Sequence, residues 1–210
     1  MRGTFTLAAV LGFCLAVGCG ESRPSAPGND IMQWAADPTN DLIVTKEIGD
    51  VRLTVHYLPA DALAARDIQA FGETLPARRD SIVSGYRAMA AFRLTVAPSD
   101  ALGGGDLLMQ GATNYGELVG RVETANFDLA SQLTLDTGEG EVQPAFVILD
   151  NDYGMGSKRV FTIGFELGPD WMKRVRTIDL RYVDPLFETG INHFTFAVEK
   201  IADAPTLTYE

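Results

Sequence analysis

The chain has almost no cysteine: among its 210 residues only Cys14 and Cys19 are cysteines. Beyond residue 19 this absence excludes disulfide bonds, thiolate nucleophiles and cysteine-based metal sites. A domain there must be held together by its own hydrophobic core. A hydrophobic content of 46% and an aromatic content of 9% are typical of a chain that forms such a core, and not of a disordered one.

Histidine is as scarce as cysteine, because only His56 and His193 occur. Histidine is the usual general base near neutral pH. We interpret His56, on the polar side of an alternating stretch, and His193, beside Phe194, as surface or strand-edge residues. The sequence contains neither an H-E-x-x-H zinc motif nor a Gly-x-Ser-x-Gly nucleophile elbow. It therefore predicts a protein that is not an enzyme, with no catalytic residues and no cofactor.

The chain also lacks an excess of positive charge, since 17 basic residues face 28 acidic ones and the net charge is −11. Such an acidic chain repels the phosphates of nucleic acids and anionic lipid headgroups. The sequence therefore predicts no nucleic-acid partner. Contact with a membrane is expected to come from acyl chains, because no large basic patch is available. We interpret the short basic runs at 78–79 and 173–176 as solvated faces.

The chain has no apolar run of the ~20 residues that a membrane-spanning helix needs. Its apolar stretch from Phe5 to Val17 matches instead the ~7–15-residue core of an export signal. Arg2 precedes this stretch, and Ala16-Val17-Gly18-Cys19 ends it. Together these features resemble the export signal and lipobox of bacterial lipoproteins. That resemblance implies that Cys19 is acylated, for example with palmitate, after cleavage. Plain secretion and an uncleaved apolar segment are the alternatives.

The lipoprotein resemblance implies three segments: a signal peptide at 1–18, a lipidated N-terminus with a flexible tether at 19–40, and one globular domain at 41–210. Gly20, where aspartate would retain enteric lipoproteins in the inner membrane, implies an outer-membrane, periplasmic or surface location. The stretch from 20 to 40 is rich in Pro, Ser, Gly and Asn, which is typical of a flexible tether. Within it, Ile31, Met32 and Trp34 are candidates for docking on the domain.

Apolar and polar residues alternate from 51 to 57, which predicts a half-buried strand with a hairpin partner at 42–48 and a turn at 49–50. Helices are predicted from 60 to 71, with Asp61 as N-cap and Gly72 as terminator, and from Pro76 to 88. A strand is expected at 92–98 and a short helix at 114–122.

The rest of the chain reads as strands, at 129–135, 144–149, 160–167, 178–182 and 194–198, with a turn at Gly138-Glu139-Gly140. The predicted class is α+β and β-dominated: an antiparallel sandwich-like sheet domain with two or three short helices. Whether the strands form one sheet or two stays open. The stretch 51–59 and the alternating aromatic residues near the C-terminus resemble uncharacterised lipoproteins of Gram-negative bacteria, a resemblance that implies no activity.

The densest polar cluster runs from Asp150 to Lys158, straight after an apolar strand. Asp150 and Asp152 carry the hard oxygen ligands that calcium prefers, so they are candidate metal ligands. The spacing departs from an EF-hand loop, however, because Gly154 takes the fifth position and Phe161 the twelfth. We therefore interpret the cluster as a turn and expect no metal site.

Carboxylate pairs such as Asp179 with Asp184, or Glu166 with Asp170, have the chemistry that glycosidases use. With 28 acidic residues such pairs arise by chance, so they carry little weight.

Three functions are thus compared. The first is a non-enzymatic lipoprotein that binds or helps to assemble another envelope protein. The second is a lipoprotein that binds a small ligand or glycan through exposed aromatic residues such as Trp171 and Tyr182. The third is a hydrolase that uses the carboxylates around Asp150.

Overall fold

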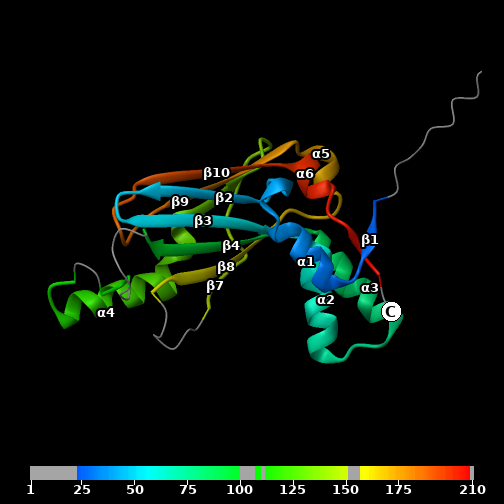
Figure 1. Cartoon of the computed structure of the whole chain (residues 1–210), viewed down its shortest axis with the longest axis horizontal. Helices are drawn as coiled ribbons and strands as arrows, with labels where there is room; N and C mark the ends of the chain where they lie inside the picture. Colours follow the sequence, from blue (N-terminus) through cyan, green and yellow to red (C-terminus); the bar gives the residue numbers. More distant parts are fainter. Residues whose placement is uncertain (1–22, 100–106, 110–111, 151–156, 209–210) are drawn as a thin grey trace, which may run out of the picture.

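Two antiparallel sheets pack face to face in the computed structural model, which describes residues 23–99, 107–109, 112–150 and 157–208 (Figure 1). The predicted α+β, strand-dominated and sandwich-like class is confirmed, and the open question of one sheet or two is answered. Cys19 and Asp152 lie outside the described residues. Lipidation of Cys19 therefore stays a prediction, as does the expectation that Asp152 lies in a turn without a metal site.

The larger sheet has five strands in the order β2-β3-β4-β8-β7. Their bounds are β2 Ile43–Ile48, β3 Val51–Leu58, β4 Met89–Pro98, β7 Phe146–Leu149 and β8 Arg159–Glu166. The predicted hairpin of β2 and β3 is confirmed, with Ile48 opposite Val51 beside the turn. Because side chains alternate along a strand, one face of this sheet is apolar and the other polar.

The smaller sheet has four strands in the order β10-β9-β5-β6. Their bounds are β5 Leu133–Asp136, β6 Glu141–Val142, β9 Thr177–Val183 and β10 Ile191–Ala197. Two predictions are wrong here. The segment Leu129–Gln132 is a 3-10 helix, so the strand expected from 129 begins only at Leu133. The Gly138–Gly140 turn joins β5 to β6, whereas the strand expected at 144–149 is β7 and lies in the other sheet.

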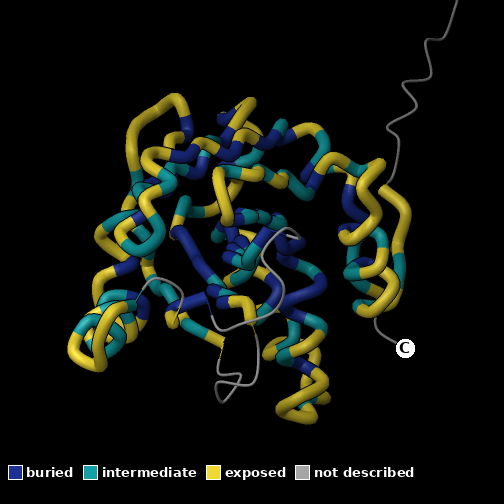
Figure 2. The backbone as a smooth tube through the Cα atoms, turned by 60° about the vertical axis from the view of Figure 1, so that its left-hand side comes forward, coloured by how far each residue is buried: buried dark blue, intermediate teal, exposed yellow. Residues whose placement is uncertain are grey.

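The hydrophobic core fills the space between the two sheets, where the buried segments of the chain concentrate (Figure 2). Aromatic rings join the sheets directly. Phe92 of β4 packs against Phe196 of β10 with 5.6 Å between ring centroids, and its other edge contacts Phe165 of β8 at 5.9 Å. Such ring pairs contribute about 0.5–1.5 kcal/mol beyond the area they bury. The core therefore fixes how the two sheets lie relative to each other.

Helices α1, α2 and α3 cover one end of the sandwich (Figure 1). The predicted helices are confirmed as α2 Ala60–Phe71, which ends at a left-handed Gly72, and α3 Pro76–Arg87. The prediction that Asp61 caps α2 is wrong, because Pro59 occupies the cap and Asp61 lies in the first turn. The Asp61 carboxylate instead accepts hydrogen bonds from Arg87.

Residues 23–40 are ordered against the domain, which corrects the prediction of a flexible tether for this part of the segment 19–40; residues 19–22 lie outside the described residues. Strand β1, Ser25–Ala26, pairs in parallel with β11, Thr206–Leu207, near the C-terminus. Helix α1, Gly28–Ala36, then buries Ile31 and Ala35 completely. The apolar residues at 31, 34 and 35 outweigh the Pro, Ser and Gly content of the surrounding sequence. A 3-10 turn, Pro38–Asn40, leads on to β2.

Two further short helices, α5 Trp171–Arg174 and α6 Val198–Ala202, lie near β1 and β11. The predicted helix near 114–122 is confirmed as α4, Tyr115–Glu123, followed by a π-helical turn, Thr124–Asp128. Helix α4 projects from the opposite end of the molecule and buries none of its residues (Figure 1). No helix among the described segments is long and apolar enough to cross a membrane.

Candidate functional site

A large hollow lies at the helical end of the molecule, between α1, α2 and the β1–β11 pair, and we name it the α1–α2 groove. Its volume is about 630 Å³, which is within the range of about 300–1,000 Å³ typical of sites for small ligands. Pro27 and Gly28 enter it from α1, Leu207 from β11 and Arg93 from β4. The groove therefore exists only because the N-terminal segment folds back onto the domain.

A glycine sets the close approach of α1 to α2. A Cβ atom built on Gly28 would lie only 2.2 Å from the Cβ atom of Ala65 in α2. Any other residue at 28 would push the two helices apart. The pair of small residues therefore fixes one wall of the groove.

Polar contacts of Asp61 hold α2, α3 and the C-terminal strand together behind the groove. The Arg87 guanidinium donates to the Asp61 carboxylate over 3.0 and 2.5 Å, and the backbone N–H of Leu207 donates to the same carboxylate over 3.2 Å. A further hydrogen bond joins the Tyr86 hydroxyl of α3 to the carboxylate of Asp67 in α2. The helical end thus forms a rigid support for the groove.

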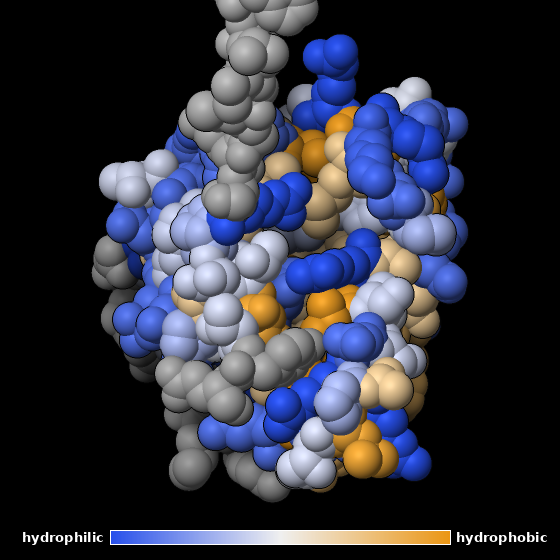
Figure 3. Space-filling model, turned by 90° about the vertical axis from the view of Figure 1, so that its right-hand side faces the viewer, coloured by the Kyte–Doolittle hydropathy of each residue, from blue (hydrophilic) through white to orange (hydrophobic). Residues whose placement is uncertain are grey.

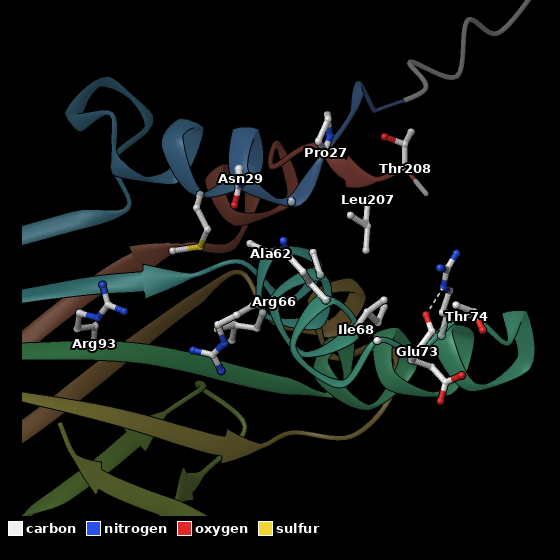
Figure 4. Close-up of a pocket in the computed structure, with 17 residues that line it drawn as sticks. Pro27, Asn29, Ala62, Arg66, Ile68, Glu73, Thr74, Arg93, Leu207 and Thr208 are labelled. Atoms are coloured by element: carbon white, nitrogen blue, oxygen red, sulfur yellow. Dashed lines mark hydrogen bonds between the residues drawn. The ribbon is translucent and has the colours of Figure 1, made fainter. Parts of the chain in front are cut away.

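The groove is apolar along its length and cationic at one end. Its apolar residues come from α1, α2 and β11: Met32, Ala62, Leu63, Ala65, Ile68 and Leu207. Figure 3 shows apolar surface within a hollow on this face, bordered by hydrophilic residues. In Figure 4 the side chains of Arg66 and Arg93 lie at one end, while Glu73 and Thr74 lie at the other.

Arg93 is the most unusual polar residue of the groove. It projects from the polar face of β4, is half-buried, and its Nε atom is inaccessible to solvent. It forms no hydrogen bond or ion pair with any described residue. A guanidinium nitrogen that is withdrawn from water without an acceptor carries an unfavourable desolvation free energy, which a bound anion would offset. Nearby Arg66 is exposed and forms a 3.3 Å ion pair with its neighbour Asp67.

Glu73 supplies negative charge at the other end of the groove. The backbone N–H of Leu75 donates to its carboxylate over 2.9 Å and holds the pKa of Glu73 below its ordinary value. Its own carbonyl accepts from the Arg79 guanidinium over 2.8 Å. The Glu73 carboxylate is also paired with Arg78 over 3.5 Å, and Arg79 lines the groove at this end, so the charge of Glu73 is balanced there by neighbouring guanidinium groups.

His56 attaches α1 to the larger sheet next to Arg93. Its Nε2 atom lies 2.9 Å from the carbonyl oxygen of Ala35, and since a carbonyl only accepts, Nε2 carries the proton. Burial lowers the pKa of His56, the hydrogen bond to Ala35 opposes this, and the charge of Arg93 lowers the pKa further. His56 is therefore a neutral structural donor beneath α1, and not the exposed strand residue expected from the sequence.

We expect this histidine to make stability depend on pH. Because the folded-state pKa of His56 is lower than the ordinary value near 6.5, the unfolded chain binds its proton first as pH falls. The stability that neutral His56 contributes is complete above about pH 6.5 and is lost as pH falls through the folded-state pKa. His56→Gln keeps a donor for Ala35 but does not titrate. Urea unfolding of this variant at several pH values should show a smaller loss of stability on acidification, and an equal loss would contradict the assignment.

The structure places the carboxylates singled out from the sequence in structural roles. Asp179 binds His193 on the neighbouring strand, with its Oδ2 atom 2.6 Å from the ring Nδ1, and accepts from the Thr195 hydroxyl over 3.0 Å. Asp184 is buried and accepts from its own loop. Asp179 and Asp184 are therefore each occupied by other partners. Among the described residues, the Asp150 carboxylate accepts a hydrogen bond from the Thr162 hydroxyl over 3.4 Å.

Acidic groups elsewhere form no site either. Asp170 forms an ion pair with Lys173 over 2.8 Å, with both side chains exposed. No group of three His, Cys, Asp or Glu residues in the described parts of the chain is arranged to hold a metal ion. Trp171 and Tyr182 are buried, with at most 1% of either residue exposed. They offer no exposed rings, so the basis for glycan binding through them is removed.

Sequence reasoning missed Arg66 and Arg93, because each looks like an ordinary outward-facing residue of a helix or strand. The only available signal was the apolar triplet at 31, 32 and 34, which marked a segment able to dock on the domain. Where α1 docks could not be predicted from local pattern, and its position turns Arg93 from a surface residue into a groove residue.

No protein-family model matches the chain, and a search of curated proteins found none similar to it. The candidate site therefore depends on geometry and charge alone.

Proposed function

We propose that the protein is a lipid-anchored, non-enzymatic binding protein of the cell envelope, and that the α1–α2 groove binds an amphiphile with an apolar body and an anionic head. The observation that carries this proposal is Arg93, a half-buried guanidinium without a protein partner among the described residues, at one end of an apolar groove. Guanidinium groups bind carboxylate and phosphate oxygens in bidentate geometry.

The position of Arg93 in the groove supports one orientation of the ligand. An anionic head would lie against the guanidinium of Arg93, whose Nε atom is withdrawn from water, with the exposed Arg66 nearby. The apolar body would then lie along α2 toward Leu207, in contact with the apolar residues of the groove. At the far end the guanidinium groups of Arg78 and Arg79 are already engaged with Glu73.

The anchor proposed at Cys19 supports a ligand that comes from the membrane. Ser25 of β1 is bound to the domain and lies six residues after Cys19, since 25 − 19 = 6. At about 3.5 Å per extended residue the connecting chain reaches at most about 20 Å. The domain would therefore stay close to the bilayer, within reach of amphiphiles in the outer membrane.

An envelope-protein partner is the second candidate function, and the surface around α4 favours it. Tyr115 and Phe127 are each 80% exposed, and Met109 is 59% exposed. Large apolar residues gathered on a projecting element are typical of protein-binding surfaces. The two candidates differ in what the protein carries when it is isolated from its membrane.

Titration calorimetry with three probes that share a twelve-carbon chain tests the groove: dodecanoate, dodecanol and dodecyltrimethylammonium, each below its micelle-forming concentration. We expect dodecanoate to bind most tightly, because only its head is anionic. Arg93→Gln should weaken its binding by about ten- to a hundred-fold, as for the loss of one charge-assisted contact. Arg176→Gln removes an equal charge from an exposed loop and serves as the control. Equal affinity for the three probes, or equal losses in both variants, would contradict the proposal.

A further inference from the structure

A second, smaller pocket lies on the other side of α2 from the groove and shares no residue with it. Its volume is about 180 Å³, and it lies between the end of β3, the start of α2, helix α5 and the segment after α6. Tyr57, Trp171, Met172 and Ile201 line it together with alanine and proline residues. A cavity of about 150 Å³ is enough for a benzene molecule, whereas one water needs only about 10–15 Å³. The pocket therefore has the size of a small organic ligand.

Two buried polar atoms of this pocket lack partners. The hydroxyl of Tyr57 and the indole N–H of Trp171 form no hydrogen bond within the part of the chain that the structure describes. Tyr57 is completely buried and Trp171 is 1% exposed. Tyrosine hydroxyls and indole N–H groups usually find a partner when they are buried, and leaving them unpaired is unfavourable. Phe92 and Phe165 show that the core accepts plain phenyl rings, so these polar atoms are not needed for packing.

The chemistry of the two atoms indicates what would bind them. An indole N–H can only donate a hydrogen bond. Burial raises the pKa of Tyr57 far above its ordinary value, so its hydroxyl stays neutral and can donate as well. The ligand atom that meets both must therefore be an acceptor.

The charged residues of the pocket favour an anionic acceptor. Arg87 forms an ion pair with Asp61, and Lys173 forms one with Asp170, so the charges cancel within each pair. Arg23 also lines the pocket and is exposed, and it has no ion pair or hydrogen bond among the residues described. One guanidinium thus remains to neutralise a ligand. We propose that this pocket binds a small carboxylic acid with a ring-sized apolar body, whose carboxylate accepts from Tyr57 and Trp171 and faces Arg23.

Benzoate is the probe that matches this size and charge, with benzyl alcohol as its neutral counterpart. The indole N–H of Trp171 can be followed directly by ¹⁵N nuclear magnetic resonance of the purified protein. The chain has one other tryptophan, Trp34, and Trp34→Phe assigns the two indole signals. We expect benzoate to shift the Trp171 signal saturably, and benzyl alcohol to do so with lower affinity.

Tyr57→Phe keeps the ring and removes only the hydroxyl, so the fold should be retained. It should raise the dissociation constant for benzoate about ten-fold, as for the loss of one hydrogen bond to a charged group, and Arg23→Gln should also raise it. Arg93→Gln, in the α1–α2 groove, should leave it unchanged, which separates this site from the groove. Absence of a saturable shift, or equal affinity in wild type and Tyr57→Phe, would overturn the proposal and leave only water as the partner of these atoms.

Discussion

Asp184→Ala is expected to destabilise the protein by about 3 kcal/mol or more, the largest effect of any single substitution considered. The Asp184 carboxylate is buried and accepts five hydrogen bonds within its loop: from the Tyr182 hydroxyl, from the backbone N–H groups of Leu186, Phe187 and Thr189, and from the Thr189 hydroxyl. Alanine would leave these donors without a partner in the turn between β9 and β10. Urea unfolding would measure the loss.

A double-mutant cycle shows whether the buried hydroxyl is part of this loss. Tyr182→Phe removes the donor that points at Asp184 from the core, so the two substitutions together should cost less than the sum of their separate costs. Asp136→Ala is a matched control, because Asp136 is exposed and accepts over 2.8 Å only from the backbone N–H of Gly138. A loss at Asp184 no larger than the loss at Asp136 would contradict this account of the loop.

Gly28→Ala is expected to separate α1 from α2 and to remove dodecanoate binding together with about 1–3 kcal/mol of stability. The added methyl group would lie 2.2 Å from the Cβ atom of Ala65, which is short and fixed to its helix and cannot move aside. Because this contact forms a wall of the α1–α2 groove, stability and binding should fall together. Urea unfolding and the dodecanoate titration would measure both.

Two further variants make the Gly28 prediction specific. Gly28→Ala combined with Ala65→Gly transfers the methyl group from one helix to the other and should recover dodecanoate binding. Stability should also recover, except for the loss of about 1 kcal/mol that glycine causes inside α2. Gly85→Ala in α3 adds a methyl group where no atom lies within 4 Å and should stabilise the protein slightly. If the double variant does not recover binding, the close contact is not what shapes the groove.

Most of the sheet architecture could be predicted from the sequence because alternation is a local signal. The strands around Leu53, Leu94, Phe161 and Leu180 each place one apolar face toward the core, and the pattern marks them without knowledge of their neighbours. Sheet membership is not local. The strand at 146–149 looks like the partner of its predecessor, yet it pairs with β8 in the other sheet.

The candidate site could not be predicted, because it is made by a contact between distant segments. Composition alone predicts a flexible chain before residue 40, whereas burial of Ile31 and Ala35 against the domain determines its real conformation. The environments of Arg93 and Tyr57 depend on the segments that pack over them. The sequence shows Arg93 as a charged strand residue and Tyr57 as an apolar one. The docked helices make Arg93 a groove residue and Tyr57 part of the wall of the smaller pocket.

Native mass spectrometry of the protein extracted from its own membrane tests the central proposal most directly. We expect a chain that begins at Cys19, carries covalent acyl mass, and holds in addition the non-covalent mass of one anionic amphiphile. Arg93→Gln should lose the non-covalent mass and keep the acyl mass, and Cys19→Ser should lack the acyl mass. An unacylated chain would contradict the anchor. An acylated chain that carries a partner protein and no amphiphile would contradict the proposed ligand and favour the surface around α4.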